Sequence, residues 1–128
     1  MRHALTNANL PMPQGYSRAV LAPAGETIYT SMTAPVDRDG GVVGPGDATL
    51  QAQRVLANIG DILEQHGSSL DEVVKVTAYV VSAADLPAVM AVIAQTFADP
   101  QPAISLAVTP LPNPSFLVEI DAVAAVPS

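Results

Sequence analysis

Apolar side chains recur at helical spacing in two segments of the chain. The first segment begins after Asp47, a residue type that often caps helix N-termini, and stops before Gly67, which suits a helix end. A second segment follows Ser82. The residues on the two inward-facing stripes are Ala52, Val55, Leu56, Ile59, Ile62, Leu63 and His66, then Leu86, Val89, Met90, Ile93 and Phe97. This periodicity predicts two helices with one buried face each.

Three other segments have the composition of β-strands. Residues 73–81 form an almost continuous β-branched run, which is typical of a largely buried strand. Residues 104–108 and 116–126 are two further apolar segments, separated by a loop that contains three prolines. The C-terminal half therefore contributes three strands.

The N-terminal half contains weaker signals. Residues 16–21 and 27–31 flank the turn-forming sequence Pro-Ala-Gly-Glu, and this arrangement predicts a β-hairpin. The glycine- and proline-rich residues 35–46 indicate a loop, and residues 69–72 have capping-box spacing that predicts one short turn.

This element order predicts an α+β domain over residues 1–128, with two helices on one face of a single sheet. The last strand alternates. Val118, Ile120, Ala122 and Ala124 share one face, and Leu117, Glu119, Asp121, Val123 and Ala125 share the other. Both faces carry apolar residues, so we expect the uncovered face to pack against another subunit.

The composition supports self-association. Charged residues make up 13% of the chain against about 25% in typical soluble domains, while 49% of its residues are hydrophobic. A net charge of −7 with five basic residues argues against nucleic acid or an anionic membrane as a partner. The chain has no cysteine, no secretory-type apolar N-terminus and no membrane-length apolar run. These features predict a cytoplasmic protein.

Several segments, in this order, give the chain a specific pattern. It resembles the Rid (YjgF) family of enamine/imine deaminases, and the matching segments are residues 15–20, 28–31, 49–63, 67–77, 102–105 and 118–122. The resemblance implies a chorismate-mutase-like, ferredoxin-like subunit and a homotrimer with clefts between subunits. It also implies that small imino acids or 2-oxo acids bind there and that water replaces nitrogen to release ammonia, without metal or cofactor.

The resemblance is incomplete at the substrate cleft. The family has an arginine between Pro-Ala and Ser that clamps the substrate carboxylate, and this chain has Ile104 there. An alkyl chain cannot replace a guanidinium–carboxylate pair. Met32 and Met90 likewise stand where the family has small or polar residues. The three changes predict a drier pocket, or one that no longer binds small molecules.

Glu119 matches the family glutamate that orients the attacking water. It is interpreted either as a base with a raised pKa or as a polar contact between subunits. Asp121 shares its strand face, and the structural interpretation is favoured for it. Tyr16 matches a tyrosine that lines the cleft, and it is otherwise an ordinary aromatic residue at a sheet edge.

Four further residues have weaker assignments. Arg18 shares a strand face with Tyr16 and either replaces the missing cation or is a solvated charge. Ser31 and Ser105 match in residue type and either donate to a ligand or satisfy nearby backbone. His3 is expected in a mobile tail, and with His66 it lacks the spacing of metal ligands.

These observations support two functional hypotheses. The first is a divergent Rid-like enzyme that hydrolyses or tautomerises a small imine, enamine or related carbonyl compound without the usual carboxylate clamp, and a role in specialised metabolism would suit it. The alternative is a non-catalytic trimer that binds an apolar ligand or a partner protein.

Overall fold

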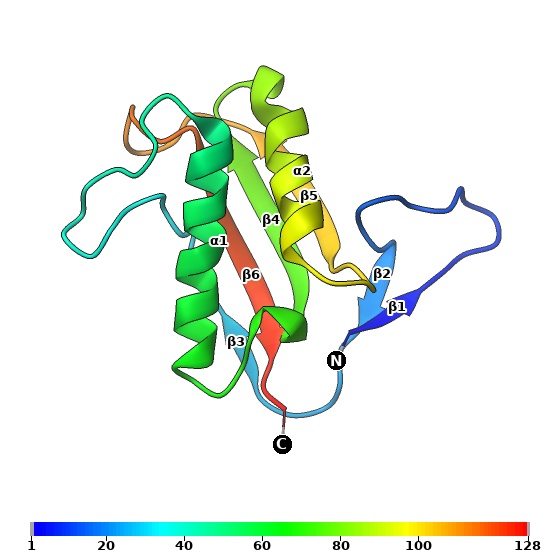
Figure 1. Cartoon of the computed structure of the whole chain (residues 1–128). Coiled ribbons are helices and arrows are strands. Elements are labelled where there is room, and N and C mark those ends of the chain that lie inside the picture. The colour runs from blue at the N-terminus through cyan, green and yellow to red at the C-terminus, as the bar shows by residue number, and fades with distance from the viewer. Residues whose placement is uncertain (1, 128) are drawn as a thin grey trace.

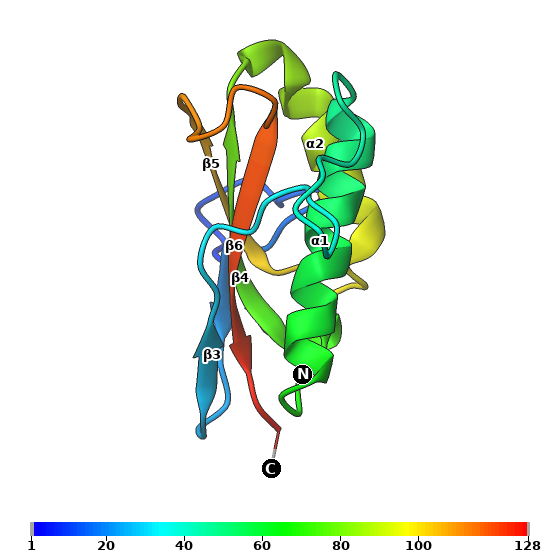
Figure 2. The same cartoon turned by 90° about the vertical axis from the view of Figure 1, so that its left-hand side faces the viewer.

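The computed structural model describes residues 2–127, which form a sheet with two helices on one face (Figure 1). The helices are α1 (Ala48–Glu64) and α2 (Leu86–Thr96). Seen from the side, both helices lie on the same face of the sheet and the opposite face is uncovered (Figure 2). The α+β class and the one-sided helix layer predicted from the sequence are confirmed.

The four-stranded sheet has the order β3-β6-β4-β5. These strands are β3 (Thr27–Tyr29), β6 (Val118–Ala125), β4 (Val73–Val80) and β5 (Ala103–Val108). β6 is antiparallel to both of its neighbours, whereas β4 and β5 are parallel. The parallel pair follows from the helical crossover, because α2 returns the chain to the starting end of the sheet.

Helix α1 begins and ends where the sequence predicts. The Asp47 carboxylate accepts a hydrogen bond from the Leu50 amide at 3.0 Å, and so caps the N-terminus. Gly67 adopts a positive φ of 81° just beyond the C-terminus, where few other residues are stable. The predicted inward stripe is buried except at its end, since Ile62 is 39% exposed and His66 lies beyond the helix.

Helix α2 follows a short 3₁₀ turn, η2 (Ala83–Asp85), in which the Ser82 hydroxyl accepts from the Ala84 amide at 3.2 Å. The turn predicted at residues 69–72 is also present, as η1 (Leu70–Glu72). Its capping-box hydrogen bond is not formed, because the Ser69 side chain makes no cap contact.

The core lies between the helices and the inner face of the sheet. Alternate residues of β4 and β6 fill it, and Val76, Ile120 and Ala124 are completely buried there against Ile59 and Ile93 of the helices. The intervening residues of both strands point to the uncovered face. The predicted alternation is therefore confirmed within β6, whereas Leu117 precedes the strand and packs against the core.

The predicted N-terminal hairpin is wrong. Strand β2 (Ala19–Leu21) pairs antiparallel with β1 (His3–Leu5), and β3 pairs instead with β6. His3 consequently belongs to a strand and not to a tail. The turn sequence between β2 and β3 does not join a hairpin, because β2 pairs with β1 and β3 pairs with β6.

Neither helix of the described chain has the length and the apolar character that crossing a bilayer requires.

Candidate functional site

Glu119 is a buried carboxylate on the uncovered face of the sheet. It lies in β6, opposite Tyr79 of β4, and is 5% exposed. Its Oε2 atom has no hydrogen-bond partner within the described residues. Burial raises the pKa of the Glu119 carboxyl, because an apolar environment disfavours its charged form. A carboxyl in this condition holds its proton more tightly than an exposed glutamate.

Residues after β3 run beside Glu119. Thr33 and Ile120 exchange two backbone hydrogen bonds, of 2.8 and 3.2 Å, so this segment continues the edge of the sheet along β6. Ser31 is exposed, and its carbonyl accepts from the Thr33 hydroxyl at 3.2 Å. Met32 is 39% exposed. Ser31 and Met32 thus belong to the β3 edge of the sheet.

Asp121 has a partner within the same chain. The Tyr79 hydroxyl donates to its Oδ2 atom at 2.8 Å, and this hydrogen bond is the main cause that raises the pKa of Tyr79. Asp121 shares the uncovered face with Glu119, as predicted. The Tyr79 contact gives its side chain a structural role.

At the opposite edge, β5 carries Ile104 and Ser105 on different faces. Ile104 lies next to Val76 and packs partly against the core, on the helix side. Ser105 points to the uncovered face, where its hydroxyl accepts from the Lys75 ammonium at 2.7 Å. Met90 also packs against the core, from α2.

Tyr16 and Arg18 lie beside the start of β5. The residue between them, Ser17, forms a parallel bridge with Ala103. The Arg18 guanidinium lies over the Tyr16 ring, 5.7 Å from its centroid, and donates to the Pro11 carbonyl at 2.9 Å. Both side chains line a cavity of about 200 Å³ between the N-terminal loop and residues 99–101.

Apart from Met90, which lies in α2, the predicted site residues form two groups on one sheet, one towards its β3 edge and one at its β5 edge. Glu119 lies in β6, next to β3 and two strands from β5. The β3-side group contains Ser31, Met32 and Glu119, and the β5-side group contains Tyr16, Arg18, Ile104 and Ser105. Strands β3 and β5 are separated by three strand spacings, roughly 14 Å at about 4.8 Å each. One chain alone does not bring the two groups into contact.

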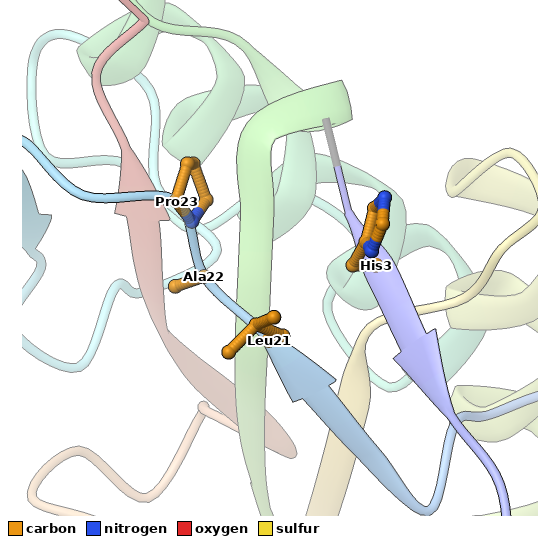
Figure 3. Close-up of a pocket in the computed structure, with 4 residues that line it drawn as sticks. All are labelled: His3, Leu21, Ala22 and Pro23. Atoms are coloured by element: carbon orange, nitrogen blue, oxygen red, sulfur yellow. The ribbon is translucent and has the colours of Figure 1, made fainter.

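Another cavity lies away from both groups. It has a volume of about 240 Å³ and is lined by His3, Leu21, Ala22 and Pro23. Figure 3 shows His3 on β1, Leu21 at the end of β2, and Ala22 and Pro23 on the segment that follows β2. The side chains of Leu21, Ala22 and Pro23 carry no group that binds a metal ion. Residues 2–127 contain no cluster of three His, Cys, Asp or Glu side chains suited to a metal ion.

The sequence analysis missed two polar residues on the uncovered face. Lys75 and Tyr79 alternate with the buried residues of β4 and contact Ser105 and Asp121. The alternation of Lys75 and Tyr79 with apolar residues indicates that one face of this strand is polar, whereas its β-branched composition predicts a largely buried strand. Only one face of β4 is covered in the single chain.

Comparison with known proteins places the chain among related sequences. The sequence profile of the family described as Endoribonuclease L-PSP matches residues 6–126. A RutC family protein of Pyrococcus horikoshii is 36% identical over 126 residues, which cover 97% of this chain and 98% of that protein. The 3-aminoacrylate deaminase RutC of Acinetobacter baylyi is 36% identical over 101 residues, 79% of this chain and 80% of that protein.

Solved structures agree with these matches. The Rid family protein YyfB from Yersinia pestis has a TM-score of 0.84 and 31% identity, over 97% of this chain and 98% of that one. RidA from an Antarctic Psychrobacter has a TM-score of 0.73 and 26% identity, over 96% and 94%. The chain belongs to the Rid (YjgF) family, which is also described as the endoribonuclease L-PSP family.

Proposed function

We propose that this protein is a divergent Rid-type enzyme that hydrolyses, or tautomerises, a small imine or enamine without the usual carboxylate clamp. The observation that carries the proposal is Glu119, a buried carboxylate with an unpartnered oxygen on the uncovered sheet face. The 3-aminoacrylate deaminase among its relatives adds support, since that enzyme's name describes loss of nitrogen from an enamine.

In the proposed hydrolysis, Glu119 takes a proton from water while the water oxygen bonds to the imine carbon. Glu119 passes this proton to nitrogen as the carbon–nitrogen double bond becomes single, which gives a carbinolamine. Glu119 then takes the hydroxyl proton of the carbinolamine and delivers it to nitrogen as the carbon–nitrogen bond breaks, so the products are a carbonyl compound and ammonia. Because the base must be ionised, turnover falls as pH drops through a pKa that burial has raised above that of an ordinary glutamate.

The site we propose is completed by a neighbouring copy of the chain. The β3-side and β5-side groups cannot meet within one sheet, but they meet if the β3 edge of one subunit faces the β5 edge of the next. Such head-to-tail contacts close into rings, and a homotrimer with three clefts is the ring we propose. The low charge content of the chain supports burial of surface between subunits.

The substrate we propose lacks a carboxylate at the position the family usually clamps. Ile104 supplies no charge there, and Met32 of the neighbouring subunit would add an apolar surface, whereas Met90 packs against the core from α2 and would shape the pocket only indirectly. Tyr16 would line the same side of the cleft as Ile104 and polarise the substrate, while Ser31 and Ser105 would donate hydrogen bonds. The reaction needs no cofactor in this scheme, and we place it in the cytoplasm.

RNA is not the proposed substrate, despite the family description. The chain carries a net charge of −7 and five Lys and Arg residues. One of the five, Arg2, is buried and hydrogen-bonded to backbone. The remaining four provide too little positive charge for the phosphate contacts that dominate RNA affinity.

A matched pair of imines tests the proposal. Butan-1-imine, generated by an amine oxidase, and 2-iminobutanoate, generated by an amino-acid oxidase, both have four carbons, and only 2-iminobutanoate carries a carboxylate. We expect the protein to accelerate decay of the neutral imine, measured as ammonia release above the spontaneous rate. Glu119→Gln should reduce that acceleration at least about 100-fold, the range typical of a lost general base.

Asp121→Asn is the matched control, because Asp121 shares the strand and face of Glu119 but already binds Tyr79. Its activity should stay within about threefold of wild type. If wild-type protein accelerates neither imine and Glu119→Gln changes no measured property, the enzyme proposal is wrong. The non-catalytic trimer that binds an apolar ligand or a partner protein is then the better account.

A further inference from the structure

Arg2 is the most extensively bonded side chain in the described structure, and no functional assignment so far includes it. It is 4% exposed, although it carries a charge near the start of the chain. Its guanidinium also lies over the Phe97 ring, 5.6 Å from the centroid. A charge is buried only where partners replace its hydration.

The partners of Arg2 are backbone carbonyls from two distant parts of the chain. The guanidinium donates to Leu70, Asp71 and Val73, at 2.9, 3.0 and 3.1 Å, and to Ala98 and Pro100, at 2.7 and 2.5 Å. The first three acceptors lie in η1 and at the start of β4. The other two lie in residues 98–102, called here the entry segment because it leads into β5.

The entry segment cannot satisfy its own backbone. It has no regular secondary structure, and Pro100 and Pro102 lack an N–H group. Its carbonyls are instead satisfied by the N-terminal part of the chain. Arg2 binds those of Ala98 and Pro100, while the Ser17 hydroxyl and amide bind those of Gln101 and Pro102.

These contacts reach the β5-side group of the candidate site. Ile104 and Ser105 follow the entry segment directly, and Ser17 lies between Tyr16 and Arg18. A one-residue slip at the start of β5 would exchange the faces of Ile104 and Ser105. Whatever holds the entry segment therefore fixes the face of β5 on which each of these two side chains lies.

We propose that Arg2 is a positioning residue for the β5-side half of the site: it holds the entry segment against η1 and β4 and so fixes the placement of Ile104 and Ser105. The catalytic consequence rests on the function proposed above. The structural consequence, local order in β5 that depends on residue 2, can be tested without any substrate.

Hydrogen exchange measured by mass spectrometry gives that test on Arg2→Met, which removes the donors and keeps an apolar chain. Amides of residues 103–108 should exchange at least about tenfold faster than in wild type, through local opening. Amides of α1 should change no more than in Arg38→Met, which loses an exposed arginine from the loop before α1. Arg2→Lys keeps the charge with fewer donors and should give a smaller effect in β5.

Two results would overturn the positioning role. One is exchange in residues 103–108 that matches the Arg38→Met control. The other is an equal rise in β5 and α1, which would mean that Arg2 supports overall stability only. If Arg2→Met does not fold, the same comparison is decided with Arg2→Lys.

The catalytic consequence has a separate readout. In Arg2→Lys, the KM for butan-1-imine should rise at least about threefold, while the acidic limb of the pH profile stays in place, because Glu119 lies in β6, two strands from β5. A shifted limb contradicts the assignment. If wild-type protein shows no turnover, the proposed function fails, and the exchange data still decide whether Arg2 positions β5.

Discussion

Glu119 is the proposed catalytic base, and its burial makes the ionised carboxylate destabilising for the folded chain. Burial raises the pKa of its carboxyl, so the folded chain holds this proton more tightly than the unfolded chain. Stability is therefore lost as pH rises from the ordinary glutamate pKa through the raised one, and the loss persists at higher pH. Glutamine has the same shape and no charge.

We accordingly expect Glu119→Gln to melt at a higher temperature than wild type at about pH 8, by roughly 2–6 °C, and to show little difference at about pH 4. Thermal unfolding of both proteins at the two pH values measures this. A lower melting temperature for the variant at pH 8 would mean that a partner stabilises the charged carboxylate.

Ile104 decides substrate class in the proposed scheme. Ile104→Arg introduces the cation that the family uses, at the edge where Tyr16 and Arg18 also lie. We expect the variant to gain at least about tenfold in kcat/KM for 2-iminobutanoate and to gain nothing for butan-1-imine. Ammonia release with the two imines measures both changes.

The same assay can show instead that Arg18 binds the substrate carboxylate. If wild-type protein already turns over 2-iminobutanoate well, and Arg18→Gln abolishes this while sparing butan-1-imine, then Arg18 replaces the missing clamp. Its guanidinium lies over the Tyr16 ring and donates a hydrogen bond to the Pro11 carbonyl. Ile104 would then be irrelevant to carboxylate recognition.

Helix α1 is hydrogen-bonded to two loops through the buried side chain of Gln51. Gln51 is completely buried; its amide donates to the Gly44 and Ser115 carbonyls at 3.2 and 3.0 Å and accepts from the Leu117 amide at 2.8 Å. It thereby holds the start of β6, two residues before Glu119.

Gln51→Leu should leave the Ser115 carbonyl and the Leu117 amide without partners, whereas the Gly44 carbonyl keeps a hydrogen bond from the Asp47 amide at 3.0 Å. At about 1–3 kcal/mol for each buried group, partly relieved by water, we expect a loss of roughly 2–4 kcal/mol of unfolding free energy. Urea unfolding measures it. Gln53→Leu, an exposed position on the same helix, is the control and should change stability by less than about 0.5 kcal/mol. Equal effects of the two substitutions would contradict the role of Gln51.

The elements that sequence predicts well are those defined by local patterns. Helical spacing and caps located α1 and α2, and period-2 alternation placed Glu119 and Asp121 on one face of β6. The pairing of strands is decided by distant segments. β3 pairs with a strand more than ninety residues away, so the turn at residues 23–26 suggested a false hairpin.

The candidate site was predictable by residue type but not by position in space. Glu119, Tyr16 and Ile104 come from motif order, whereas their separation on two sheet edges depends on the strand order. Arg2 was missed because nothing near it in sequence predicts burial. Its five acceptors lie about 70 to 100 residues away.

At the scale of the whole molecule, we propose that two copies of the chain build each site. One face of the sheet is uncovered, and the β3-side and β5-side groups lie apart within one chain. Light scattering should give three times the 13.1 kDa chain mass, and a monomer would contradict the assembly.

Mixing of two variant subunits tests whether each site is shared between neighbouring chains. Glu119→Gln and Tyr16→Ala, each inactive alone in the butan-1-imine assay, are co-expressed with different tags and purified as mixed assemblies. If Glu119 of one subunit works with Tyr16 of the next, one of the three clefts in each mixed trimer contains both intact residues and recovers activity. If both residues act within one chain, no cleft is intact, and mixed assemblies that release no more ammonia than the separate variants would contradict the account.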